Sequence, residues 1–416
     1  MKVAGIVAEY NPFHNGHQYH IEETKKQTGA DYVIAVMSGD FVQRGAPAFL
    51  DKYDRTYAAL AGGCDLVLEL PVIYSSASAE FFAGGAVHLL NGMGVCDILS
   101  FGSEDGNLES LHLFASILAN EPEEYQKLLR EQLKAGQAFP AAREKALTEY
   151  INIHKIQWNI SDLSSFLKGS NNILGLEYLK ALKKSGSKIT PVTIMRKEAA
   201  YHDTKLHDRI SSASAIRHHM FKQRTVSAIS DSVPEETFQA IHKAIDTQRG
   251  FPDYNHLTPY LHSAMLSGCE PEEYLDWDKD LANRMKQLPW ATLSFTDIAD
   301  QLKSRNITHS RVHRALLHFI LGIRQEVFTE QFVRNPVPYA RILGFRKESS
   351  RLIKAINQNG SIPLITKPAS IHNYLNPEDS WMWEKDLTAS RLYQSILFQN
   401  WEFRLPSAYE RSPIIL

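Results

Sequence analysis

The sequence has few cysteines and no long apolar segment, and both absences limit what the protein can be. Its 416 residues include three cysteines, Cys64, Cys96 and Cys269, without a Cys-x-x-Cys spacing. Such a set argues against a disulfide scaffold or a zinc ribbon and is typical of a reducing cytosol. No apolar run approaches the length of a membrane span, and no signal-peptide pattern precedes the first expected strand. We therefore expect a cytoplasmic protein without a membrane segment.

An excess of one charge sign is also missing. The formal net charge is -2, with 22% charged and 44% hydrophobic residues, which is the profile of an ordinary globular protein. A chain without overall positive charge can offer nucleic acid only a local basic patch. The length allows two or three domains, each with its own core.

The opening segment carries the most specific signal in the chain. An apolar run at 3–8 predicts a buried strand, and a turn at 11–12 leads to His14-Asn15-Gly16-His17 at the expected start of a helix. A helix N-terminus offers backbone N–H groups and the positive end of its dipole to an anion. Two histidines there would add donors for phosphate oxygens, and the glycine would let a flat ring approach. Histidine pairs also bind metals, so the position directly after a strand is what favours a nucleotide.

Short apolar strands alternate with helices over the first hundred residues. This pattern predicts an α/β fold with a doubly wound parallel sheet, of the nucleotidyltransferase-like Rossmann type. Ligands of such folds bind outside the carboxyl ends of the strands, where the polar clusters 11–17, 38–44 and 102–104 lie. We interpret residues 107–168 as a helical insertion. The expected strands are 3–8, 31–37, 65–70, 96–101 and 188–195, and the expected helices include 50–61 and 76–90.

A second helix start suited to an anion is expected after the fifth strand. Arg196 and Lys197 end that strand, and Ser211 and Ser212 precede a helix that carries Arg217 in its first turns. Serine hydroxyls and a fixed cation at a helix N-terminus can hold the oxygens of a phosphate chain. A capped helix with a surface arginine is the plainer interpretation. A phosphate site is favoured because this helix start and the histidine motif occur in the same chain.

The pattern changes near residue 226, where strand signals fade and the chain becomes mostly helical. We therefore expect a catalytic domain at 1–225 and a mostly helical domain at 226–416, with a returning strand at 362–365. Basic residues interleaved with aromatic residues suit an RNA backbone with unstacked bases, although a solvated charged face gives the same pattern. These basic residues are Lys303, Arg305, Arg311, Arg314, Arg324, Arg334, Arg341, Arg346, Lys347, Arg351 and Lys354.

Together these motifs resemble the bacterial tRNA(Met) cytidine acetate ligases, a branch of the His-x-Gly-His nucleotidyltransferase-like proteins. The resemblance covers nearly the whole length, and its N-terminal motifs are the specific ones. Ser170 departs from the proline expected before the paired asparagines. The shared segments are EYNPFHNGH at 9–17, MSGDFVQRGAPA at 37–48, DLVLELP at 65–71, FGSE at 101–104, NNILG at 171–175, YHD at 201–203, ISSASAIR at 210–217 and YARILGFRK at 339–347.

The resemblance implies an ATP- and acetate-dependent ligase, with Mg²⁺ on the phosphates of ATP. Acetate and ATP would give acetyl-adenylate and pyrophosphate, and the acetyl group would pass to N4 of the wobble cytidine of elongator tRNA(Met). A metal held by protein ligands alone is not expected. The ATP site carried over by motif consists of Val7, Ala8, Glu9, Tyr10, Asn11, Pro12, Phe13, His14, Asn15, Gly16, His17, Gln18, Tyr19, His20, Gly102, Asn171, Arg196 and Lys197.

Further roles are our own hypotheses from physical chemistry. The two motif histidines would stabilise charge developing at the α-phosphate, while Ser211, Ser212 and Arg217 would hold the departing pyrophosphate. Arg44, after the second strand, is the candidate anchor for acetate. Asp40, Glu104 and His202 all remain possible proton acceptors for acetyl transfer to a base splayed out of the anticodon.

Two other functions are compatible with the same motifs. One is a nucleotidyltransferase that joins a nucleotide to a phosphorylated small molecule, which would need a second cationic pocket. The other is a non-catalytic RNA-binding protein that keeps an ATP site.

Overall fold

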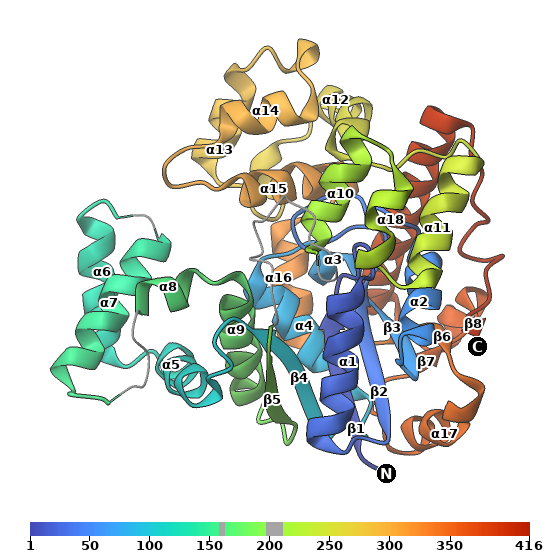
Figure 1. Ribbon diagram of the computed structural model, residues 1–416. Coiled ribbons are helices and arrows are strands. Elements are labelled where there is room, and N and C mark those ends of the chain that lie inside the picture. Colours follow the sequence, from blue (N-terminus) through green and yellow to red (C-terminus); the bar gives the residue numbers. More distant parts are fainter. Residues whose placement is uncertain (138, 158–162, 197–210) are drawn as a thin grey trace.

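An eight-stranded sheet forms the centre of the protein, as Figure 1 shows for this computed structural model, which describes residues 1–137, 139–157, 163–196 and 211–416. The strands are β1 (Val3–Ala8), β2 (Tyr32–Ser38), β3 (Leu66–Leu70), β4 (Ile98–Ser103), β5 (Thr190–Met195), β6 (Ala340–Phe345), β7 (Leu364–Ile365) and β8 (Ile414–Ile415). Strands β5-β4-β1-β2-β3 run parallel in that order, and β6 joins β3 antiparallel. The predicted doubly wound parallel sheet is therefore confirmed.

Helices cover both faces of this sheet. Alternate residues of β2 point to opposite sides: Val33 and Ala35 enter one buried cluster, while Ile34 and Val36 enter the other. Period-two alternation places successive side chains on opposite faces, and two buried faces explain why the strands are apolar throughout. The first cluster lies under α1 (Asn15–Thr28) and α2 (Lys52–Ala61), and the second under α4 (Ala79–Gly92) and α9 (Ser170–Lys184).

The remaining helices form two further groups. Figure 1 shows α5–α8 projecting to one side of the sheet and α12–α15 lying beyond its carboxyl edge. Their bounds are α3 (Val72–Ser75), α5 (Leu108–Asn120), α6 (Glu123–Lys134), α7 (Phe139–Ile153), α8 (Leu163–Lys168), α10 (Ala213–Lys222), α11 (Glu235–Asp246), α12 (Thr258–Leu266), α13 (Lys279–Gln287), α14 (Phe295–Leu302), α15 (His309–Leu321), α16 (Gln325–Arg334), α17 (Ser350–Asn359) and α18 (Pro377–Trp401). In the described part of the chain, none of the helices combines the length and apolar character that a membrane crossing needs.

The segment after residue 226 contributes more to the sheet than its sequence suggested. The returning strand expected at 362–365 is present as β7, but β6 was not expected, although it extends the sheet from β3. Strand β8, near the C-terminus, pairs with β6. The division into domains at 1–225 and 226–416 stays a prediction. The expected helix 76–90 is present as α4, which begins three residues later than expected and follows the separate short helix α3.

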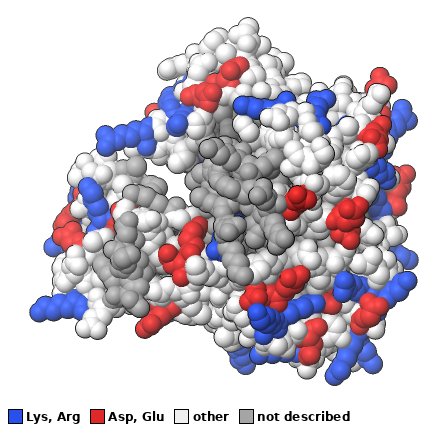
Figure 2. Space-filling view, viewed as in Figure 1, with Lys and Arg blue, Asp and Glu red and all other residues white. Residues whose placement is uncertain are grey.

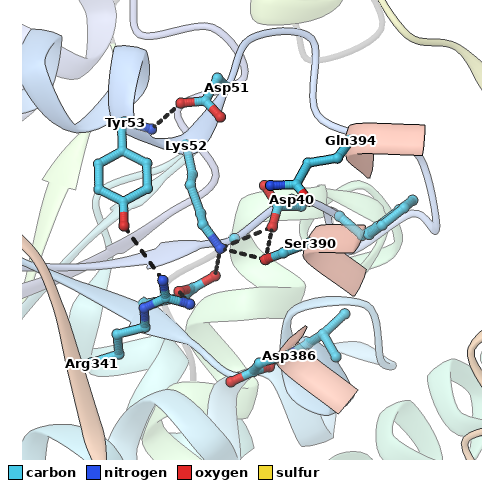
Figure 3. Close-up of polar contacts among 12 residues, drawn as sticks. Asp40, Asp51, Lys52, Tyr53, Arg341, Asp386, Ser390 and Gln394 are labelled. Carbon is cyan, nitrogen blue, oxygen red and sulfur yellow. Dashed lines mark hydrogen bonds and ion pairs between the residues drawn. The ribbon is translucent and has the colours of Figure 1, made fainter. Parts of the chain in front are cut away.

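A buried charge network joins the ends of β2 and β3 to α18 and β6 (Figure 3). Lys52 Nζ donates to Asp40 Oδ2 at 2.8 Å and to Glu69 Oε1 at 2.7 Å. Ser390 Oγ donates to Asp40 Oδ2 at 2.6 Å, and Arg341 pairs with Glu69 Oε2 at 3.1 Å. The side chains of Lys52 and Asp40 are each 4% exposed. Opposite charges thus hold segments that are distant in the sequence.

Candidate active site

A cavity of about 190 Å³ opens at the carboxyl ends of β1, β4 and β5. This is the edge at which ligands of parallel α/β sheets bind. It collects residues from three predicted motifs. The predicted site residues that line it are Val7, Ala8, Glu9, Tyr10, Asn11, His14, Gly16, His17, Tyr19, His20, Gly102, Asn171, Arg196, Ser211, Ser212 and Arg217.

Two histidines cap the start of α1 beside this cavity. The backbone N–H of Gly16 donates to His14 Nδ1 at 3.1 Å, and the N–H of His14 donates to His17 Nδ1 at 3.2 Å. The two rings stack with centroids 3.7 Å apart. A backbone N–H can only donate, so each Nδ1 is unprotonated and each neutral ring carries its hydrogen on Nε2. One nitrogen of each ring therefore caps the helix, and the other supplies an N–H donor.

The histidines at the cavity are kept neutral. Burial lowers the pKa of His14 to about 3, with Arg196 and Arg217 adding to the effect. Burial, His14 and Arg196 together hold the pKa of His17 well below its usual range. Burial and then Arg196 lower the pKa of His20 to about 4. At neutral pH the cavity therefore presents neutral imidazole donors beside two guanidinium groups, a combination that suits a polyanionic ligand.

The start of α10 faces the same cavity. Ser212 is the N-cap, since its Oγ accepts from the N–H of Ala215 at 3.0 Å. Ser211, Ser212 and Arg217 all line the cavity. The guanidinium of Arg217 donates to the carbonyl oxygen of Asn11 and so links α10 to the turn after β1. The two predicted helix starts therefore line one cavity.

The third side of the cavity is built by Gly102, Asn171 and Arg196. Arg196 extends the pairing of β5 with β4, because its N–H donates to the carbonyl of Ser103 at 3.1 Å. Its guanidinium donates to Asn171 Oδ1 at 3.2 Å. Three segments distant in the sequence thus meet at one wall.

Some predicted residues lie elsewhere. Phe13 is buried beneath the cavity, with its ring centroid 4.9 Å from that of Tyr10. Asn15 points away and donates through Nδ2 to the carbonyl of Asp231 at 2.8 Å. The predicted residues that are not among the described lining residues are Pro12, Phe13, Asn15, Gln18, Asp40, Arg44 and Glu104. Lys197 and His202 lie outside the described residues.

Arg44 is the predicted residue whose placement differs most from expectation. Its neighbour Gln43 lines the cavity, whereas Arg44 is not among the described residues that do. The carbonyl of Arg44 accepts from Tyr254 Oη at 3.1 Å, which places it near the start of α12. The rule that strand ends meet at one edge gives the edge but not the direction of each side chain. The role of Arg44 as an acetate anchor stays a prediction that this geometry does not support.

Several lining residues were not among the predicted site residues, although some lie within the segments shared with the family. Most are apolar side chains from α4, α9, β4 and β5, and an apolar pattern predicts only burial. Proximity to a predicted residue could have indicated two of them, because Phe101 precedes Gly102 in the chain and Ile194 pairs with Gly102 in the sheet. The unpredicted lining residues are Gln43, Phe82, Phe101, Leu174, Tyr178, Ile194, Met195, Ala213 and Ser214.

The expected basic face of residues 303–354 is only partly available to RNA. Arg341 is buried in the network with Glu69, and Arg314 is buried with its Nε 2.8 Å from Asp276 Oδ2. The expectation that these two arginines belong to an RNA-binding surface was therefore wrong. On the face shown in Figure 2, Lys and Arg side chains are interspersed with Asp and Glu rather than gathered into one patch.

Comparison with known proteins places this site in a family. The sequence matches the HIGH Nucleotidyl Transferase family over residues 1–406. It is 40% identical over 393 residues to the tRNA(Met) cytidine acetate ligase of Caldanaerobacter subterraneus subsp. tengcongensis, with 94% of this chain and 95% of that protein covered. The corresponding protein of Acetivibrio thermocellus is 37% identical over 410 residues, with 97% of each chain covered. The chain belongs to the tRNA(Met) cytidine acetate ligase family.

Solved structures of this family agree with the fold described above. A crystal structure of Thermotoga maritima TmcAL bound with alpha-thio ATP (Form II) has a TM-score of 0.90 and 34% sequence identity, with 100% of both chains covered. The apo structure (form I) of the same protein gives a TM-score of 0.92 at the same identity and coverage. The predicted family is therefore confirmed.

Proposed function

We propose that this member of the tRNA(Met) cytidine acetate ligase family activates acetate with ATP. It then acetylates N4 of the wobble cytidine of elongator tRNA(Met). The relatives carry the ligase name over nearly the full chain, and a solved relative is bound with an ATP analogue. The observation that carries the proposal is the convergence of two capped helix starts and two arginines on one cavity at the carboxyl edge. An enzyme that acts on tRNA would work in the cytoplasm.

In the first step an acetate oxygen would attack the α-phosphorus of ATP, and the bond to the β-phosphate would break. Acetate is already an anion at neutral pH, so this step needs no general base. Donors aimed at the charge that develops on the phosphates are what it requires. His14 and His17 would supply Nε2–H donors to the α-phosphate, and Ser211, Ser212 and Arg217 would hold the pyrophosphate as it leaves.

In this proposal Mg²⁺ would bind to the phosphates of ATP. Among the described residues no cluster of three or more His, Cys, Asp or Glu side chains is placed to hold a metal. Mg²⁺ commonly keeps several waters and binds substrate phosphates with one or two carboxylates. Glu9 is the acidic residue among the described lining residues, so it is the carboxylate available at the cavity.

In the second step the N4 amine of the cytidine would attack the acetyl carbon, and AMP and a proton would leave. The amine is a weak nucleophile, which explains the need for a mixed anhydride. The target base has to leave the anticodon stack to reach the buried cavity. Helices α12–α15 lie beyond the carboxyl edge of the sheet (Figure 1) and are the proposed support for the tRNA.

ATP–pyrophosphate exchange with purified protein and Mg²⁺ tests the proposal. Exchange that depends on acetate, followed by an N4-acetylcytidine product when tRNA(Met) is added, would support both steps. A stable nucleotide conjugate with a phosphorylated small molecule would instead favour a nucleotidyltransferase. ATP binding without pyrophosphate release, with or without tRNA, would contradict catalysis and favour a non-catalytic RNA-binding protein.

A further inference from the structure

Glu104 holds the start of α9 from a different segment of the chain. The helix has Gly169 as its N-cap, which provides no side-chain cap. Glu104 follows β4, and its Oε1 accepts from the N–H of Asn171 at 3.0 Å. Its Oε2 accepts from the N–H of Asn172 at 2.8 Å. A carboxylate at this position also interacts favourably with the positive end of the helix dipole.

The contact is reciprocal and tightly fitted. Asn172 Oδ1 accepts from the N–H of Glu104 at 3.1 Å, and Asn172 Nδ2 donates to the carbonyl of Phe166 at 3.1 Å. A Cβ at Gly169 would lie 2.8 Å from Glu104 Oε2. A side chain at position 169 would therefore push the carboxylate away from the helix, so glycine is what allows this approach.

The same carboxylate fixes the side chain of Asn171. Asn171 Nδ2 donates to Glu104 Oε1 at 2.9 Å. An ionised carboxylate can only accept, so the amide nitrogen must face Glu104 and the amide oxygen must face the other way. That oxygen accepts from NH1 of Arg196 at 3.2 Å. Asn171 and Arg196 line the cavity, whereas Glu104 is not among the described residues that do.

We propose that Glu104 is a positioning residue for the nucleotide site, acting through Asn171 on the guanidinium of Arg196. This inference rests on the proposed function, because it takes the cavity to be the ATP site. It assigns to Glu104 a role different from that of proton acceptor in acetyl transfer. Its oxygens are already directed at donors from α9, and among the described residues Asn171 links it to the cavity.

The substitution Glu104→Gln tests this with almost no change of volume. An amide –NH₂ at the Oε1 position would face the N–H and the side-chain amide of Asn171, and at the Oε2 position it would face the N–H of Asn172. At least one hydrogen bond to the start of α9 is therefore lost in either orientation. We expect ATP binding, measured by calorimetry, to weaken by about tenfold or more, the size expected when hydrogen bonds to a charged group are lost. Glu109→Gln, a nearby exposed glutamate in the first turn of α5, is the matched control and should bind ATP as the wild type does.

A double-mutant cycle with Arg196→Met separates positioning from simple support of the helix. If Glu104 acts through the guanidinium, Glu104→Gln should weaken ATP binding much less in the Arg196→Met background than in the wild type. Full additivity of the two effects would overturn the inference. Unchanged ATP binding and acetate-dependent exchange, with loss of acetyl transfer alone, would overturn it in favour of a base role.

Gly169→Ala tests the same inference without altering a cavity residue or the charge of the carboxylate. The added Cβ should displace Glu104 and weaken ATP binding in the same direction, and it keeps the inference testable if Glu104→Gln does not fold. Normal ATP binding by a folded Gly169→Ala protein would contradict the inference. If the wild type binds ATP but does not activate acetate, the proposed function fails while this inference can still be judged from binding.

Discussion

The cavity and the Lys52 network lie at the same edge of one sheet but differ in how their buried polar groups are paired. In the network, Lys52 lies within hydrogen-bond distance of two carboxylates, and Glu69 is shared with Arg341. In the cavity, burial beside Arg196 keeps the imidazoles neutral, and they remain donors. Paired charges in the first region join distant segments, whereas the second region concentrates donors that suit an anion. Substitutions in the two regions should therefore damage different properties.

The largest expected effect on stability is that of Lys52→Met. Burial lowers the pKa of Lys52, but Asp40 and Glu69 outweigh burial and keep the ammonium charged. Removing it would leave two carboxylates buried without this partner, and breaking a buried ion pair costs about 3–5 kcal/mol. Denaturant unfolding should show this loss. Lys26→Met is the control, because the Lys26 side chain, which pairs with Glu23, is 75% exposed. Its unfolding free energy should stay close to that of the wild type, and equal losses in the two variants would contradict the comparison.

In the cavity, His17→Asn should damage activity rather than stability. The asparagine oxygen can still accept from the N–H of His14, so the helix cap is largely kept, but the Nε2–H donor is lost. We expect acetate-dependent pyrophosphate exchange to fall about 10²–10³-fold, the effect of removing one donor to a developing charge. Gln27→Ala, on an exposed part of the same helix, is the control. A loss of stability as large as that of Lys52→Met, with exchange preserved, would reverse the contrast between the two regions.

Acid should protonate His20 at the cavity before it protonates Asp40 in the network. The pKa of His20 is lowered to about 4, so between pH 6.5 and 4 the unfolded chain binds a proton that the folded chain does not. Stability must then fall as the pH falls, by up to about 1.4 kcal/mol per pH unit for one such group. Burial raises the pKa of Asp40, but Lys52, Ser390 and Arg55 together outweigh burial and lower this pKa. This carboxylate therefore loses its contribution only below about pH 4.

The measurement is denaturant unfolding at several pH values between 7 and 4.5. His20→Gln can keep a hydrogen bond to Ser100, which His20 Nε2 contacts at 3.0 Å, but it cannot take up a proton. We expect its unfolding free energy to depend less on pH than that of the wild type, by about one proton. The same slope in both proteins would show that His20 titrates normally in the folded chain.

Local patterns in the sequence predicted the parts of the site that are built locally. The apolar run 3–8 coincides with β1, and the expected helix start after it is the observed α1. Ser212 caps α10 as expected. In these places the signal and the structure involve the same few residues, because a strand, a turn and a cap are decided by neighbours in the chain.

Long-range contacts were beyond such patterns. Lys52 bonds Ser390 across 338 positions, and nothing in either segment indicates the other. Strand β6 was missed for the same reason. It pairs with β3 because the helices before it bring the chain back to the edge of the sheet. Arg44 and Glu104 show the same limit at the site: the strand-end rule predicted their edge, but tertiary packing decides that one turns away and the other faces α9.

The smallest effect separates a cap that only supports a helix from one that also serves a site. Ser212→Ala removes the cap of α10. Thr308→Ala removes the cap of α15, in which Thr308 Oγ1 accepts from the N–H of Arg311 at 3.3 Å. Each loss should lower stability by about 1 kcal/mol. Because Ser212 lines the cavity and Thr308 is not among its described lining residues, the KM for ATP should rise only for Ser212→Ala. Equal KM values in the two variants would mean that the start of α10 supports the fold and does not contact the phosphates.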